Sequence, residues 1–367
     1  MNVYLYVVAA TLILGALMPQ KGRKRIYYIA VMTVIHAFVQ AFRYCHLTGD
    51  LMKYHHLFNQ TAAYGWFSSE IIQEGRNSGF NLLMKLVYEL TGGDFQVLLI
   101  VISIITHVIL AYIIYRYSPA PWLSFVTWNC MSFYIFGFSS IKQALAMAFV
   151  MLAFVGIAER KPKVFVGAMI LAGLVHVPSL IFLPAYWLAQ RRVNRKMIVF
   201  YLILGALVYV FKNQFVNFIK SFYYEDDEIF VFSGEVGSRF IMLLGFTLFG
   251  LLFKGFPGRD MEKLFHLMAV ATILQMLSGF DNIFTRLTDY YFQFAILYIP
   301  MTFFPVEQKK QRSPLQRVFP FNERSLKMLS VFICVFMLWF YWTYSINITI
   351  AYEADNYLNF RFMWDVS

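Results

Sequence analysis

Charged side chains are scarce in this 367-residue chain, because only 14% of its residues are Asp, Glu, Lys or Arg, against roughly 25% in soluble domains. Cysteine is also scarce, and Cys45, Cys130 and Cys334 are too widely spaced for a disulfide framework or a zinc site. The sequence has no glycine-rich phosphate loop, no Asp-x-Asp motif and no His-x-x-x-His pair with a third ligand. These absences argue against ATP-driven transport, and we expect no metal and no cofactor.

Apolar residues are abundant instead: 60% of the chain is hydrophobic, 19% is aromatic and the mean hydropathy is +0.59. Runs of about 20 apolar residues recur from end to end, as transmembrane helices require, and aromatics lie near their ends. We therefore predict an all-α polytopic membrane protein, a single integral membrane domain over residues 1–367. About 10 full spans are expected, at 3–19, 26–42, 95–115, 120–138, 143–158, 197–212, 239–253, 264–280, 288–305 and 328–350.

Basic residues set the predicted orientation. The net charge is +11, but these residues sit in short loops between spans, which is the positive-inside pattern and not a nucleic-acid footprint. A basic cluster at 21–25 follows the first apolar run, whereas a signal peptide carries its charge before the run. We therefore expect a multi-pass protein whose N-terminus lies outside, with the basic inner loop 306–327 meeting anionic lipid head groups.

Residues 164–189 are unusual because strongly basic segments flank them on both sides and Pro178 interrupts them. A re-entrant helical hairpin with its tip near His176 leaves 21 of the 31 Lys and Arg residues inside. A single crossing leaves only 13 of them inside, so the charge pattern favours the hairpin. A proline-kinked single span is the alternative.

The longest outer loop, 43–94, contains apolar positions at helical spacing between residues 80 and 90, followed by two glycines. We predict a short interfacial helix there. Four cations at span mouths fall on the same outer side, together with several acids and the expected hairpin tip. These candidate residues are Arg43, Lys142, Arg239 and Arg286 for phosphate, Asp50, Glu74, Asp281 and Asp289 as acids, and His176.

Chemistry gives these residues roles. The planar guanidinium of arginine binds phosphate bidentately, and a carboxylate or imidazole can accept a proton from a hydroxyl nucleophile. Each residue also has a structural alternative. Arg43 and Lys142 can be snorkelling anchors, and Asp50 can cap a helix. Arg239 and Arg286 can form ion pairs with Glu235 and Asp289, and His176 can bond the backbone that Pro178 frees.

Short motifs follow one another over roughly residues 40–300. They are Arg43 with Thr48-Gly-Asp50 and Tyr54, Glu74 before Gly79-Phe-Asn-Leu-Leu83, Lys142-Gln143-Ala-Leu-Ala146, His176-Val-Pro-Ser179, and Arg286 with Tyr290-Tyr-Phe292 and Pro300. In these motifs and their order the chain resembles the EpsG group of Wzy-type bacterial polysaccharide polymerases. The family usually shows Arg-Gln where this chain has Lys142-Gln143, and a small residue where it has Pro178.

The resemblance implies an enzyme of the bacterial cytoplasmic (inner) membrane. It would join oligosaccharide repeat units carried on undecaprenyl diphosphate into exopolysaccharide, capsule or O-antigen, by metal-independent glycosyl transfer with the lipid diphosphate as leaving group. Its partners would be these lipid-linked oligosaccharides, membrane lipids, a chain-length regulator and a flippase. An O-antigen ligase or another lipid-carrier glycosyltransferase, an O-acyltransferase, and a flippase for lipid-linked oligosaccharide are the competing functions.

Within this hypothesis, Arg239 and Arg286 bind the donor diphosphate, while Arg43 and Lys142 hold a second phosphate. His176 ranks first as general base because imidazole titrates near neutral pH, followed by Asp50 and Glu74. Tyr54, Gln143 and Tyr290 are expected to contact sugar.

Overall fold

The computed structural model describes residues 3–45, 49–72, 77–223, 237–254, 259–280, 282–304, 328–329, 331–340, 343 and 360–364. All the named elements in this part of the chain are helical, as the sequence predicts. The helices are α1 (Val3–Leu17), α2 (Arg25–Ala41), α3 (Gly49–Gln60), α4 (Ser69–Ile72), α5 (Ser78–Thr91), α6 (Phe95–Tyr117), α7 (Pro121–Cys130), α8 (Phe133–Phe136), α9 (Ile141–Ala158), α10 (Pro162–Val175), α11 (Ala185–Ala189), α12 (Arg195–Val210), α13 (Lys212–Tyr223), α14 (Ser238–Lys254), α15 (Arg259–Gln275), α16 (Asn282–Phe292), α17 (Ala295–Phe303) and Val331–Phe340.

Two of the described helices, α6 and α9, are long and apolar enough by length and composition to cross a membrane. Shorter apolar helices include α1, α2 and α10. The molecule is therefore a helical bundle with apolar helices, consistent with a helical membrane protein. The expected number of about 10 spans stays a prediction.

Helix α9 lies at the centre of the bundle, where it contacts α6, α10, α15 and α16. Its sequence is rich in small residues, and these let neighbouring helices approach closely. At its C-terminal end Gly156 lies so near α10 that a Cβ there would stand 2.5 Å from the backbone nitrogen of Phe165. The first turn of α9 carries Lys142 and Gln143, two of the residues predicted for the site.

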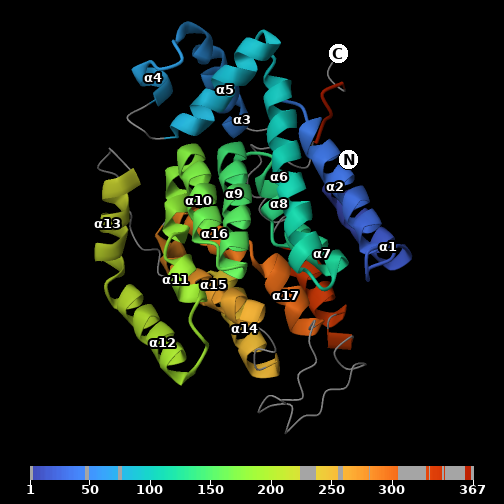
Figure 1. Cartoon of the computed structure of the whole chain (residues 1–367), viewed down its shortest axis with the longest axis vertical. Coiled ribbons are helices and arrows are strands. Elements are labelled where there is room, and N and C mark those ends of the chain that lie inside the picture. Colours follow the sequence, from blue (N-terminus) through green and yellow to red (C-terminus); the bar gives the residue numbers. More distant parts are fainter. Residues whose placement is uncertain are drawn as a thin grey trace.

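Helices α3, α4 and α5 cover one end of the bundle (Figure 1), which we call the capped end. The predicted interfacial helix at 80–90 corresponds to α5, and it stops at Gly92, whose φ of 69° is the left-handed conformation that glycine adopts freely. Helix α5 packs on the end of α10, where a Cβ on Gly79 would lie 2.8 Å from the Leu174 Cβ. Helix α3 was not predicted.

The segment 164–189 breaks at His176 and turns back on itself. Helix α10 ends at Val175, a 3₁₀ turn covers Val177–Phe182, and α11 follows. The Phe165 and Tyr186 rings, on the two arms, have centroids 5.0 Å apart, and Gln190 donates a hydrogen bond to the Ile157 carbonyl at the end of α9. Both flanks therefore lie at the end opposite the cap. This reversal is the shape that the charge pattern favours, and its depth in a bilayer stays a prediction.

Two expected continuous spans are interrupted. The span at 120–138 divides into α7 and α8, because Ser132 takes a left-handed φ of 66°. The span at 288–305 divides into α16 and α17 at Gln293 and Phe294. No proline or glycine stands at either break, so the sequence carried no local signal for them.

A short segment near the C-terminus returns to the capped end. Tyr44 donates its backbone N–H to the Arg361 carbonyl at 2.9 Å, and Met363 donates to the Phe42 carbonyl at 2.9 Å. This antiparallel bridge joins residue 43 to residue 362. We call residues 360–364 the C-terminal strap. The strap pairs with residues 42–44, which directly follow α2 and precede α3.

Candidate functional site

The candidate site gathers from five separate parts of the chain: α3, the start of α9, the segment around His176, α14 and α16. Helix α3 supplies Asp50, and the turn before α9 supplies Ser139, whose hydroxyl donates to the Asp50 carboxylate at 3.0 Å. Asp50 stands in the first turn of α3, where the helix dipole favours a negative charge. Asp50 therefore lies within α3, one residue after its start, and its carboxylate contacts the bundle. Ser139 itself was not predicted as a site residue.

Tyr54 lies one helical turn after Asp50 on α3, and its ring packs against Phe80 of α5 with centroids 5.7 Å apart. Burial raises the pKa of Tyr54 to about 12; the Asp50 carboxylate adds to this rise and the Arg286 guanidinium opposes it. The phenol is therefore protonated at physiological pH and can donate a hydrogen bond. The same interactions show that Tyr54 lies within electrostatic range of both charges.

His176 meets α16 at the tip of the folded-back segment. Its Nδ1 lies 2.5 Å from the Tyr290 hydroxyl, and Tyr290 is completely buried. The alternative in which His176 bonds the backbone near Pro178 is not what the structure shows, because the side-chain partner is this hydroxyl. Lys142 and Arg286 both lie within electrostatic range of His176. A partly buried imidazole thus lies near two cations.

Arg286 is the most exposed of the predicted cations whose positions are described. Gln143, at the start of α9, donates to the Arg286 backbone carbonyl at 2.8 Å and fixes this point of α16. The guanidinium lies over the Phe136 ring, 6.0 Å from its centroid. The backbone of Arg286 is thus fixed by Gln143, and its guanidinium rests on an aromatic ring. Because this side chain is still exposed, its guanidinium can bind an anionic ligand.

Arg239, in the first turn of α14, forms an ion pair with Asp289 of α16, the acid that the sequence alternative offered to Arg286. The side chains of Arg239 and Asp289 are only 16% and 8% exposed. The guanidinium also lies over Phe292, 5.1 Å from the ring centroid. Asp289 in turn interacts electrostatically with Arg286. One carboxylate therefore links the two arginines predicted to bind diphosphate.

Arg43 does not reach the open part of this cluster. It is 1% exposed, donates to the backbone carbonyls of Gln40 and Gly137, and lies 5.4 Å from the Phe138 centroid. The alternative of a snorkelling anchor is therefore wrong for Arg43. Its contacts instead hold the turn that precedes Ser139. Arginine alone in a sequence gives no sign of whether its fork will bind a ligand or the protein's own backbone.

Three residues named from the sequence, Glu74, Asp281 and Glu235, lie outside the described residues. In the described part of the chain, no group of three or more His, Cys, Asp or Glu residues stands close enough to hold a metal ion. What the described residues do assemble is a set of cations, a histidine with a tyrosine partner, and a carboxylate. Such a set can bind an anionic ligand and accept a proton.

The fold and this cluster define a helical membrane protein with a cationic, histidine-containing site at one end of its bundle. The family model that matches the chain is more specific: it is that of the EpsG family, and it covers residues 26–362. The chain belongs to the EpsG family, as the motifs around Arg43, Lys142, His176 and Arg286 suggested. No curated protein and no solved structure matches it.

Family membership points to polysaccharide biosynthesis, with a polymerase type of function and a glycosyltransferase-like enzyme. Together with the apolar helices, it also indicates a membrane protein.

Proposed function

We propose that this protein polymerises oligosaccharide repeat units carried on undecaprenyl diphosphate, at the outer face of the bacterial cytoplasmic membrane. The bond between the anomeric carbon of the growing chain and its lipid diphosphate breaks, and the diphosphate oxygen keeps the electron pair. A hydroxyl oxygen of the incoming unit forms the new glycosidic bond and gives its proton to a base. Diphosphate is a good leaving group. We propose that cationic side chains compensate the negative charge that it gains as it departs.

The observation that carries this proposal is the meeting of Arg286, Lys142 and His176 at the capped end, with each cation within electrostatic range of the imidazole. A site for glycosyl transfer from a lipid diphosphate needs fixed positive charge where the leaving group gains negative charge, and a base beside it. Arg286 has the accessible fork, and Arg239 stands next to it through their shared partner Asp289.

In the proposed reaction, Arg286 and Arg239 bind the donor diphosphate and Lys142 binds a second phosphate. Arg43 takes a positioning role, because its guanidinium is committed to backbone carbonyls. His176 acts as base in the tautomer whose Nδ1–H is donated to Tyr290, which leaves the Nε2 lone pair for the acceptor hydroxyl. Asp50 and then Glu74 follow as candidate bases.

The remaining polar residues are assigned to sugar. Tyr54 and Gln143 lie beside the charged cluster, and a protonated phenol and an amide suit carbohydrate hydroxyls. A chain-length regulator and a flippase are the expected partners in the membrane.

The test uses purified protein in lipid nanodiscs with lipid-linked repeat units, read as a ladder of products on a gel. We expect Arg286→Ala and His176→Ala to lower the polymerisation rate by about 100-fold or more. Lys163→Ala is the matched control, since Lys163 is an exposed cation near the start of α10, at the opposite end of the bundle. Normal ladders from folded Arg286→Ala and His176→Ala proteins would refute the assignment of the site.

The same assay separates the competing functions. A ligase would transfer the chain to an acceptor that is not a repeat unit, and a flippase would move the lipid-linked unit between leaflets without forming a bond. Either result in place of the ladder rejects the polymerase.

A further inference from the structure

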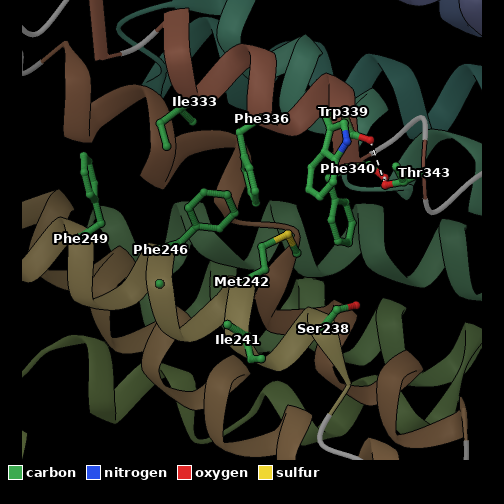
Figure 2. Close-up of a pocket in the computed structure, with 11 residues that line it drawn as sticks. Ser238, Ile241, Met242, Phe246, Phe249, Ile333, Phe336, Trp339, Phe340 and Thr343 are labelled. Carbon is green, nitrogen blue, oxygen red and sulfur yellow. Dashed lines mark hydrogen bonds between the residues drawn. The ribbon is translucent and has the colours of Figure 1, made fainter.

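An apolar cavity of about 620 Å³ lies between α14 and the helix Val331–Phe340. Figure 2 shows Met242, Phe246 and Phe249 of α14 facing Ile333, Phe336 and Phe340 across it. We call this cavity the α14 groove. Its volume falls in the usual range for ligand pockets, roughly 300–1,000 Å³. Phenylalanine faces and a flexible methionine make a wall that adapts to an irregular hydrocarbon chain.

Polar atoms of the lining side chains occur only at one end of the groove. Ser238 and Thr343 are the hydroxyl residues among those that line it, and the Thr343 hydroxyl is already donated to the Trp339 carbonyl at 2.9 Å. The next residue after Ser238 is Arg239, whose guanidinium belongs to the candidate site. One end of the groove is therefore one residue away in the chain from a cation of the candidate site, and the rest of its wall is mostly apolar.

The length of the groove fits one leaflet of a bilayer. Its lining residues on α14 run from Ser238 to Phe249, which corresponds to about 16 Å along a helix axis. The hydrocarbon core of a bilayer is roughly 30 Å thick, so the groove is about as long as one leaflet is thick. A lipid with its head group at Arg239 could therefore lay the first part of its tail along α14.

We infer that the α14 groove holds the polyprenyl tail of the lipid diphosphate donor, with the diphosphate on Arg239 and Arg286. This inference rests on the proposed function for the identity of the head group. The positive charge of Arg239, the residue that follows Ser238, matches a diphosphate, and the apolar wall of the groove matches the hydrocarbon attached to that diphosphate. The groove thus selects a long-tailed donor and fixes the direction from which it enters the site.

Gly245 offers a steric test. It lines the groove, and a Cβ placed on it would meet nothing within 4 Å, so a larger side chain can enter the groove without disturbing the helix packing. Gly167 of α10 is the matched control, since a Cβ there also meets nothing within 4 Å and Gly167 is not among the residues that line the groove. Gly245→Leu and Gly167→Leu carry the same change in chemistry.

We expect Gly245→Leu to raise KM for the undecaprenyl-linked donor by about tenfold with little change in kcat, because the tail contributes binding in both ground and transition states. A donor with a two-isoprene tail should be used equally well by Gly245→Leu and the unsubstituted protein. Gly167→Leu should match the unsubstituted protein with both donors. Equal KM values for Gly245→Leu and Gly167→Leu with the long donor would overturn the inference.

A second experiment needs no catalysis. Undecaprenyl diphosphate with a diazirine in its first isoprene units is photolysed in nanodiscs with the unsubstituted protein, and labelled peptides are mapped by mass spectrometry. Labels within 238–249 and 331–340, reduced by excess undecaprenyl diphosphate but not by phosphatidylglycerol, support the inference. Labels elsewhere, or equal competition by phosphatidylglycerol, reject it. A protein that labels in the groove but forms no ladder would reject the polymerase function while leaving the lipid site in place.

Discussion

The ion pair between Arg239 and Asp289 predicts that removing both charges restores most of the stability of the protein but not its activity. Removing one member of a buried ion pair typically costs about 3–5 kcal/mol, because the other charge stays buried without compensation. Here the two side chains keep 16% and 8% of their surface exposed, and the guanidinium retains its contact with Phe292. We therefore expect Asp289→Leu to cost about 2–3 kcal/mol, somewhat less than the full penalty.

The double variant Arg239→Met/Asp289→Leu removes both charges and should recover most of that loss, because no uncompensated charge remains. Its polymerisation rate should nevertheless stay near that of Arg239→Met alone, since the lost cation is the one proposed to bind diphosphate. Thermal unfolding in detergent, followed by tryptophan fluorescence, measures the stability of the two single variants and the double variant. The ladder assay measures their activity.

Two outcomes would contradict this reasoning. Additive destabilisation by the two single changes would mean that Arg239 and Asp289 do not stabilise each other. Full activity of a stable double variant would mean that Arg239 takes no part in binding the donor. Arg239→Lys serves as the control for charge alone, because it keeps the cation and loses the planar fork.

Four further predictions can be checked on the same preparations. Gly79→Val should loosen α5 from α10, because its Cβ would clash with Leu174, and limited proteolysis should then cut near α5 sooner. Tyr290→Phe should lower kcat more than it changes KM, because it removes the hydroxyl that orients the His176 imidazole. Steady-state kinetics with the donor and the acceptor measure both constants, and a larger change in KM than in kcat would contradict this role. Asn129→Ala should cost about 2 kcal/mol, because it leaves buried His36 without its side-chain partner, as thermal unfolding will report. The raised pKa of Tyr54 favours the folded state below pH 10, and this stabilisation should disappear between about pH 10 and 12, but not in Tyr54→Phe.

Local signals in the sequence predicted several parts of the fold well. The glycines after residue 91 end α5, the apolar run after residue 95 forms α6, and the chain breaks at His176 next to Pro178. In each case the physical cause lies within a few residues: a left-handed cap, a long apolar run, or a proline that removes a hydrogen bond. The breaks near Ser132 and Phe294 had no such cause in the sequence and depend on tertiary packing.

The candidate site was predictable to a similar extent. Charge counting brought Lys142, His176 and Arg286 to one side of the membrane, and in the described residues Lys142 and Arg286 each lie within electrostatic range of His176. The partners that orient them could not be predicted, because the Ser139 hydroxyl and the Arg286 carbonyl acquire their roles only through contacts between distant segments. The inward direction of Arg43 has the same origin, since it depends on the carbonyl of Gly137.

The C-terminal strap has a consequence for how the protein is made. Residues 42–44 leave the ribosome early in translation, yet their backbone hydrogen-bond partners are residues 361 and 363. The corner of the bundle that carries Arg43 therefore lacks these hydrogen bonds until residues 361 and 363 have been synthesised. Assembly of this corner would then follow the synthesis of the strap, so that a chain without residues 360–364 lacks the segment that covers Arg43.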